Sequence, residues 1–287
     1  MLSEALNTAE AADVVVLVLG MDGLVESEEG DGAAERTSLD LPPLQQQLLE
    51  ALTALGKPVV LVNLTGSSVD LRAADERCNA ILQGWYPGQF GGLAVAATLL
   101  GMNNPSGRLP VTFYRDTAQL PPFEDYRMDG RTYRFLSEDN PPLYPFGYGL
   151  SYTAFEYRDL TLSAYTVAAG ESVEVTATVQ NTGDCVGQEV VQLYLTDQAA
   201  SVRTPQWALC DYGKVELEPG QSAQVSFTLT PKQMAVVLED GSRVVEPGSF
   251  KVYVGGQQPG SRSRALTGRK VVSTVFTVTG EDAPLAR

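Results

Sequence analysis

The first hundred residues alternate short apolar runs with helical stretches, and this order restricts the fold more than any other feature of the sequence. Strands are predicted over 13–19 (DVVVLVL), 58–64 (PVVLVNL) and 79–85 (NAILQGW), and helices over 40–56, 73–77 and 92–101. A contiguous β-branched run is typical of a strand buried on both faces, so we expect residues 13–19 to be fully buried. Repeated strand–helix units predict a mostly parallel sheet covered by helices on both faces, which is an α/β sandwich.

The pattern changes in the second half of the chain. Residues 105–150 are rich in Pro, Gly and aromatic residues and have little periodicity, which indicates an irregular arm that packs its aromatics onto another part of the protein. From Phe155 onward, short alternating runs such as SVEVTATVQNTG and GSFKVYVGG are separated by turn signals. Strands at intervals of about 8–12 residues, with PKQMAVVL as the one candidate helix, predict an antiparallel β-sandwich.

Composition excludes several classes of function. The 287 residues include 35 acids and 20 bases, a net charge of -15, which opposes binding to nucleic acid phosphates. The count of zero histidines excludes Ser-His-Asp catalysis, Cys-His catalysis and a His-ligated metal within this chain. No run approaches about 18 apolar residues, and the first residues carry acids without a basic segment, so neither a spanning helix nor a secretory signal is expected.

One loop concentrates the acidity. Between the first strand and the first long helix, the sequence GMDGLVESEEGDGAAERTSLD places six acids within 14 residues: Asp22, Glu26, Glu28, Glu29, Asp31 and Glu35. The loop leaves the carboxyl end of a parallel strand, where open α/β sheets bind ligands. Crowded carboxylates raise one another's pKa, so one of them could serve as a proton donor. A solvated acidic surface is the alternative; a calcium site is less consistent with the spacing, which lacks the EF-hand pattern.

Three further motifs could have a functional role, but each of them also has a structural explanation. YPGQFGG (86–92) lies between a strand and a helix but matches no nucleotide-binding pattern, so its glycines are expected to permit a tight turn. TGSSVDL contains serines without a base partner, which argues against nucleophilic catalysis. Four aromatics could form a sugar platform or pack between domains, which is the more usual role of such residues: Trp85, Tyr86, Phe123 and Tyr126.

Long ordered blocks resemble the C-terminal part of glycoside hydrolase family 3, the β-glucosidase and β-xylosidase family. The blocks include GKPVVLVNLTGSSVDL, AILQGWYPGQFGGLAVAATLLGMNNPSGRLPVTFY and PLYPFGYGLSYTAFEY, and later GQEVVQLYL and VEPGSFKVYVGG. The resemblance implies a partial α/β-sandwich domain over residues 1–115, an irregular arm over 116–158 and an all-β fibronectin type III-like sandwich over 159–280. The family's N-terminal barrel has no counterpart in this sequence, so an N-terminally truncated α/β domain is expected.

The resemblance also implies a chemistry. Family members are retaining exo-β-glycosidases whose nucleophile is an aspartate on the barrel and whose general acid/base is a glutamate in a loop of the second domain. Aligning that loop with VESEEGDG without a gap puts the acid/base at Glu28, with Glu29 as the alternative. The family arginine falls on Gly32, unless the loop carries an insertion, in which case Arg36 corresponds.

The expected substrate is a β-linked oligosaccharide with terminal glucose or xylose. The expected partner is a barrel domain, in the same polypeptide or on a separate chain, and without it the chain is expected to be inactive. No cofactor or metal is implied. A non-catalytic carbohydrate-binding role and a structural remnant remain alternatives, and a periplasmic, secreted or cytoplasmic location is equally compatible with the sequence.

Overall fold

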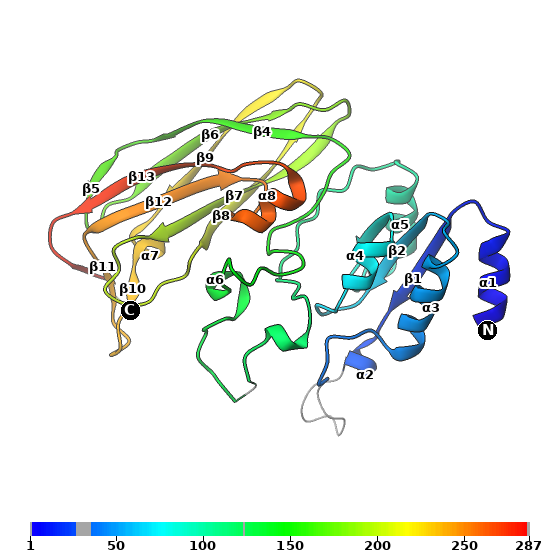
Figure 1. Ribbon diagram of the computed structural model, residues 1–287. Helices are drawn as coiled ribbons and strands as arrows, with labels where there is room; N and C mark the ends of the chain where they lie inside the picture. Colours follow the sequence, from blue (N-terminus) through cyan, green and yellow to red (C-terminus); the bar gives the residue numbers. More distant parts are fainter. Residues whose placement is uncertain (1, 27–35, 123, 286–287) are drawn as a thin grey trace. The chain divides into compact units, whose positions relative to one another are not determined.

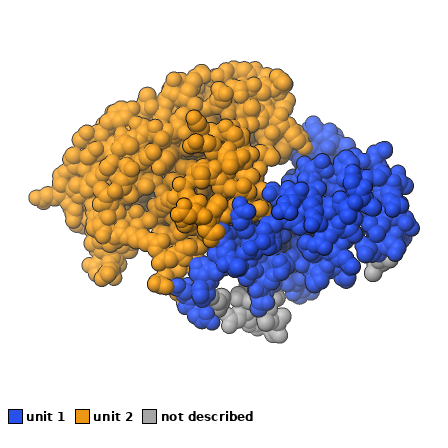
Figure 2. Space-filling view, in the orientation of Figure 1, with its two compact units in different colours: residues 1–103, 113–125 blue, residues 104–112, 126–287 orange. Residues whose placement is uncertain are grey.

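The structure, a computed structural model, describes residues 2–26, 36–122 and 124–285, and these divide into two compact units (Figure 2). Unit 1 comprises residues 1–103 and 113–125, and unit 2 comprises residues 104–112 and 126–287. The fold is therefore a mixed α/β unit followed by a β-rich unit, as the sequence predicts. In the part of the chain described, no helix is long and apolar enough to cross a membrane.

Unit 1 is built on a parallel sheet in the order β1-β2-β3 (Figure 1). The strands are β1 (Val15–Gly20), β2 (Val59–Leu64) and β3 (Ala80–Gln83). The helical segments of this unit are α1 (Leu2–Glu10), α2 (Gly23–Glu26), α3 (Pro43–Thr53), α4 (Arg72–Arg77), α5 (Gly91–Leu99) and the 3-10 turn η1 (Thr117–Gln119). The three predicted strands and the helices after them are thus confirmed, whereas α1 was not predicted.

Helix α3 packs on β1 and on α4 through a narrow apolar stripe. Leu49 and Leu52 are its buried residues, while Leu44, expected on the same stripe, is 76% exposed. The helix begins at the proline pair, with Pro42 at the N-cap, and it is followed by Gly56 in the left-handed region at φ +71°. Prolines in the first turn and a glycine after the last turn are the predicted boundary signals.

The expectation that residues 13–19 form a fully buried strand is wrong. Leu17 and Leu19 are buried, but Val14, Val16 and Val18 are about half exposed, at 50%, 51% and 56%. In the described structure β1 pairs on one side only, with β2, so it is an edge strand. Alternate side chains of a strand point to opposite faces, and one of these faces lies open in this part of the chain.

Unit 2 is a sandwich of a five-stranded and a three-stranded sheet, with a small third sheet (Figure 1). The first sheet has the order β5-β13-β12-β7-β8, the second β4-β6-β9 and the third β10-β11-β14. The elements are α6 (Thr132–Phe135), β4 (Phe155–Leu162), β5 (Thr166–Ala168), β6 (Val173–Asn181), β7 (Gly187–Asp197), β8 (Ala208–Leu217), β9 (Ser222–Leu229), α7 (Pro231–Met234), β10 (Val236–Val237), β11 (Arg243–Val245), β12 (Gly248–Gly255), α8 (Ser261–Thr267), β13 (Val272–Thr279) and β14 (Ala283–Pro284).

The two larger sheets share one apolar core. Val175 and Val179 from β6 and Val252 and Val254 from β12 are completely buried in it, together with Phe250, which stacks on Phe276 with ring centroids 5.4 Å apart. These residues occupy alternate positions of their strands, which is the periodicity that predicts a sandwich. The candidate helix PKQMAVVL shortens to α7, and its last residues form β10 instead.

The outer face of β7 is covered as well, by the aromatic arm. Tyr194 is fully buried there, and its ring meets Tyr133 edge to face, while Tyr133 stacks on Phe146 with centroids 4.1 Å apart. Gln192 on the same face donates to the carbonyl oxygen of Gly147 at 3.1 Å. The arm residues from 126 onward therefore pack their aromatics onto the sandwich within unit 2.

Candidate active site at the carboxyl edge of the parallel sheet

The three parallel strands of unit 1 end at one edge of the sheet, and the loops after them form the candidate site. The end of β1 is fixed from α3: the Gln45 side chain donates to Gly20 O at 2.6 Å and accepts from Gly20 N at 3.0 Å. A Cβ on Gly20 would lie 2.1 Å from the carbonyl oxygen of Leu64, so the two strand ends approach too closely for any side chain. These contacts fix the position at which the chain leaves β1.

A short helical turn then presents a carboxylate. Asp22 caps α2 by accepting from the backbone N–H groups of Leu24 and Val25, each at 3.0 Å. This cap fixes the turn that ends at Glu26, because it satisfies donors that have no partner within the helix. Glu26 is the last described residue before the segment 27–35.

Glu26 is bound by groups from the ends of both other strands. Its carboxylate oxygens accept from Gly66 N at 3.0 and 3.1 Å, and Oε1 also accepts from Ser67 N at 3.2 Å and from Ser67 Oγ at 3.0 Å. The hydroxyl of Tyr86 donates to Oε2. Through these bonds Glu26 joins the loops after β1, β2 and β3. Hydrogen bonds to an ionised acceptor are about twice as strong as neutral ones.

The backbone around Glu26 has the geometry that these contacts require. A Cβ on Gly66 would lie 2.5 Å from the Tyr86 ring and 2.8 Å from Glu26 Oε2, so a larger residue here would displace the two side chains that meet at this point. Trp85 has φ +54°, a left-handed conformation that is costly for a bulky residue and that turns the chain just before Tyr86. The hydrogen bond to the Glu26 carboxylate raises the pKa of Tyr86.

Arg36, the first described residue after 27–35, is bound to the same loop. Its Nη1 donates to Ser67 Oγ at 3.2 Å, and its Nη2 donates to the carbonyl oxygens of Ser38 and Asp40 at 3.0 and 3.1 Å. Ser67 therefore contacts the residues on both sides of the segment 27–35.

The predicted acid/base residues Glu28 and Glu29 lie outside the described residues, as do Asp31, Gly32 and Glu35 of the same loop. Phe123 of the aromatic group lies outside them as well. Trp85 packs edge to face on Phe113 with centroids 6.0 Å apart, and both residues belong to unit 1, so this contact lies within one unit. Tyr126 belongs to unit 2 and is 87% exposed.

Two other sequence candidates have structural roles. In YPGQFGG, Gly88 has φ +69° and a Cβ on Gly91 would meet the Pro87 ring at 2.4 Å, so the glycines permit a tight turn into α5. In TGSSVDL, the Ser67 hydroxyl donates to the Glu26 carboxylate and accepts from the Arg36 guanidinium. Its contacts therefore connect separate segments of the site.

A layer of buried amides supports the loop after β2, and the sequence reasoning did not identify it. Asn63, completely buried, donates to Thr65 Oγ1 at 3.0 Å and to Gln83 Oε1 at 2.7 Å. Gln83 in turn donates to the carbonyl oxygen of Thr65 at 3.1 Å. Polar residues ending two apolar strands, as in PVVLVNL and AILQG, are the sequence signal that could have found this layer.

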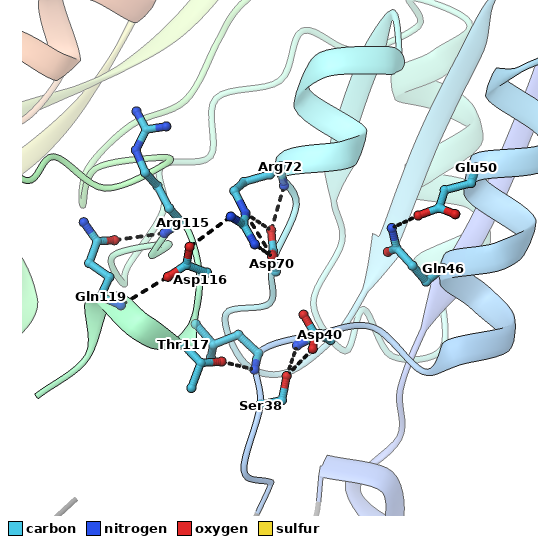
Figure 3. A network of polar contacts seen from close by, with 11 residues as sticks. Ser38, Asp40, Gln46, Glu50, Asp70, Arg72, Arg115, Asp116, Thr117 and Gln119 are labelled. Atoms are coloured by element: carbon cyan, nitrogen blue, oxygen red, sulfur yellow. Dashed lines mark hydrogen bonds and ion pairs between the residues drawn. The ribbon is translucent and has the colours of Figure 1, made fainter. Parts of the chain in front are cut away.

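A second polar network connects the loop 36–40 with residues 70–72 and 115–119 (Figure 3). Arg72 binds Asp70 at 2.6 Å and Asp116 at 2.9 Å, and its pKa is raised mainly by the hydrogen bond to Asp70. The hydroxyl of Thr117 accepts from Leu39 N at 3.1 Å, while Ser38 donates to Asp40 at 2.5 Å (Figure 3). Residues 113–125 are thus attached to unit 1 beside the loop that follows Arg36.

Comparison with known proteins identifies the family. Residues 1–152 match the profile of the Glycosyl hydrolase family 3 C-terminal domain, and residues 189–258 match the Fibronectin type III-like domain. The chain belongs to glycosyl hydrolase family 3. This confirms the resemblance and the order of the two folds along the chain.

Individual family 3 relatives agree with this assignment. The chain is 39% identical over 265 residues to the periplasmic beta-glucosidase of Salmonella typhimurium and 38% identical over 257 residues to a beta-xylosidase of Formosa agariphila, covering 89% and 88% of this chain. Among solved structures, a β-glucosidase from Erythrobacter marinus superposes with a TM-score of 0.83 at 37% identity over 97% of this chain. A Listeria innocua beta-glucosidase in complex with glucose superposes with a TM-score of 0.82 at 31% identity over 98% of this chain.

The match covers only part of each relative. The chain spans 34% of the Salmonella protein, 35% of the Formosa protein and 36% of the Erythrobacter chain. The chain thus corresponds to about a third of the length of these relatives.

Proposed function

We propose that this chain forms the C-terminal part of a retaining exo-β-glycosidase and supplies its general acid/base, Glu28, with Glu29 as the alternative. The observation that carries the proposal is the attachment of Glu26 and Arg36 at the carboxyl edge of the sheet, since these residues flank the acidic segment on both sides. The nucleophile is an aspartate on a barrel domain that this chain does not contain, in the same polypeptide or on a separate one.

The chemistry needs two carboxyl groups about 5–5.5 Å apart. In the first step the nucleophile attacks the anomeric carbon while the protonated Glu28 gives its proton to the leaving oxygen. In the second step the ionised Glu28 removes a proton from water, and the water hydrolyses the glycosyl-enzyme. Because one carboxyl group is supplied from outside, the chain by itself has no turnover.

The substrate class follows from the relatives. They carry the names β-glucosidase and β-xylosidase at nearly equal identity, 39% and 40% for two of them. We therefore propose β-linked oligosaccharides with terminal glucose or xylose as substrates. The two sugars differ by one hydroxymethyl group, so both are to be tested.

The test is a complementation experiment, in which the chain is joined to the remaining N-terminal part of the Salmonella relative and assayed on aryl β-glucosides and β-xylosides. In this complemented enzyme, Glu28→Ala is expected to lower turnover about 10²–10⁴-fold on a substrate with a poor leaving group. A good leaving group needs no protonation, so its glycosylation step is spared and the covalent intermediate accumulates. Added azide is then expected to restore turnover and yield the β-glycosyl azide.

Glu29→Ala is the matched control for this assignment. Azide rescue of the Glu29 variant instead of the Glu28 variant moves the acid/base by one residue. Rescue of neither variant contradicts the catalytic proposal and leaves the non-catalytic alternatives, of which binding of the chain to insoluble xylan or glucan supports the carbohydrate-binding one.

A further inference from the structure

Tyr86 is an exposed aromatic residue at the edge of the sheet where the three parallel strands of unit 1 end. It follows the last residue of β3, Gln83, by three positions, and it is 54% exposed. Open α/β sheets bind their ligands outside the carboxyl ends of the strands. The ring of Tyr86 therefore lies at the edge of the sheet where a ligand is expected.

The position of this ring is fixed by contacts on several sides. Its hydroxyl donates to Glu26 Oε2. A Cβ on Gly66 would lie 2.5 Å from Cε2 and 2.7 Å from Cζ of the ring, so the ring lies against the backbone of Gly66. The preceding residue, Trp85, has a left-handed backbone and packs on Phe113. A ligand that contacts a ring held in this way loses little free energy in ordering it.

The chemistry of an exposed tyrosine ring fits the face of a sugar. In β-linked glucose and xylose the substituents of the pyranose ring are equatorial, so the axial C–H groups form an apolar face. The face of an aromatic ring is the negative part of its quadrupole and attracts these weakly positive hydrogens. Since the hydroxyl of Tyr86 is bound to Glu26, its contact with a ligand would be made by the exposed ring.

We propose that Tyr86 is a substrate-binding residue, whose exposed ring stacks on a pyranose ring of a β-linked glucose or xylose oligosaccharide at the carboxyl edge of the sheet. The choice of sugar rests on the proposed function. The stacking itself depends only on Tyr86 and on the described residues that hold it, Glu26, Gly66 and Trp85. Packing of the ring against another part of a family 3 polypeptide is the alternative that the test has to separate.

A titration of the intact chain with cellotriose, and separately with xylotriose, tests the stacking. NMR follows the tyrosine ring signals, and Tyr86→Phe assigns the signals of Tyr86. These signals are expected to move saturably with at least one of the two sugars. Tyr212, a 62% exposed tyrosine on β8 of the sandwich, is the internal control, and its signals are expected to stay in place. No movement of the Tyr86 signals with either sugar, up to the solubility limit, overturns the proposal.

Variants separate the ring from the hydroxyl. Tyr86→Ala removes the stacking face and is expected to weaken sugar binding about fivefold. Tyr86→Phe keeps the ring without the hydrogen bond to Glu26, and its affinity is expected to stay within about twofold of the original. Tyr212→Ala, the matched control, is expected to leave the affinity unchanged. Equal losses in Tyr86→Phe and Tyr86→Ala contradict stacking. If Tyr86→Ala does not fold, the titration of the unaltered chain still decides.

The complemented enzyme shows whether the contact is used with substrate. Tyr86→Ala is expected to raise KM for the same oligosaccharides about fivefold with little change in kcat, and Tyr86→Phe is expected to restore KM. A packing role would instead weaken the association of the two parts and leave KM unchanged.

The outcomes distinguish this proposal from the proposed function. If Glu28 and Glu29 variants both keep full activity while sugar moves the Tyr86 signals, the acid/base assignment fails and the sugar contact stands. If Glu28→Ala abolishes turnover while no sugar moves the Tyr86 signals, the acid/base assignment stands and the sugar contact fails.

Discussion

Single residues at the sheet edge act through partners that are distant in the sequence. Glu26 binds Gly66 and Ser67, which follow it by 40 and 41 positions, and Tyr86, which follows by 60. The four donors to this carboxylate are backbone N–H or hydroxyl groups of ordinary residue types, so composition could not single them out. The sequence does predict that the acidic loop begins at this edge, but not which acid is bound and which is left for chemistry.

The first prediction concerns the titration of Tyr86. The hydrogen bond that the Tyr86 hydroxyl donates to Glu26 raises the pKa of Tyr86, and the negative charge of the same carboxylate raises it further. Glu26→Gln is expected to lower the pKa of Tyr86 toward about 10, the ordinary tyrosine value. The contribution of this contact to stability is present below that pH and is lost as pH rises through the raised pKa. NMR of tyrosine ring carbons measures the shift, and Tyr86→Phe assigns the signal.

A second residue-scale prediction concerns Cys210. Its side chain packs against the core of the sandwich, and burial raises the pKa of its thiol to about 12. The thiolate is the reactive form, so iodoacetamide at pH 8 is expected to leave Cys210 unmodified in the folded chain and to modify it after unfolding in urea. Peptide mass spectrometry identifies the site. Rapid modification of Cys210 in the native protein contradicts this expectation.

At the scale of elements, periodicity predicts most of the strands and fails where burial differs between two faces. The sandwich strands β6 and β12 alternate apolar and polar residues, so their positions follow from the sequence. In β1 every residue up to Leu19 is apolar, and such a run has the same appearance whether one face is covered or two. Helix α8 was missed because its residues, SRSRALT, have no apolar stripe, and its only buried residue is Ser263.

The open face of β1 leads to the third prediction. Val16 and Val18 are exposed on an edge strand, and an exposed apolar edge promotes association. We expect the chain to self-associate as its concentration rises, and Val16→Lys to shift the population toward monomer by placing a charge on that face. Light scattering after size-exclusion chromatography measures the mass. Val275→Lys, on a 44% exposed valine of β13, is the matched control and is expected to leave the measured mass unchanged.

At the scale of the whole molecule, a buried ion pair attaches the segment 104–112 to unit 2. Arg108 donates to Glu189 at 2.7 Å, with side chains 7% and 2% exposed, and Tyr157 donates to the other oxygen of Glu189 at 2.9 Å. Burial raises the pKa of Glu189 in spite of Arg108. Hydrophobic periodicity does not predict this pair. Its members are 81 positions apart, and Arg108 lies in an irregular segment whereas Glu189 lies in strand β7.

The fourth prediction is that removing one member of this pair destabilises unit 2 strongly. Arg108→Met leaves a carboxylate buried without its cation, a change that costs about 3–5 kcal/mol in the free energy of unfolding. The folded-state pKa of Glu189 rises further without Arg108, so protonation favours the folded state and the deficit becomes smaller as pH falls from 7 toward 5. Urea unfolding at both pH values measures it. The double variant Arg108→Met/Glu189→Met is expected to recover much of the stability, and equal deficits at both pH values would contradict the argument.

The path of the chain between the two units has a consequence for how such proteins recombine. The chain passes from unit 1 to unit 2 after residue 103, returns after 112 and leaves again after 125. A genetic crossover at any single point between these positions separates residues 113–125 from their own unit or splits the residues 104–112 from the sandwich that holds Arg108. A single crossover therefore cannot exchange unit 2 between family members with both units intact. Such an exchange has to replace residues 104–112 and 126–287 while residues 113–125 stay with unit 1.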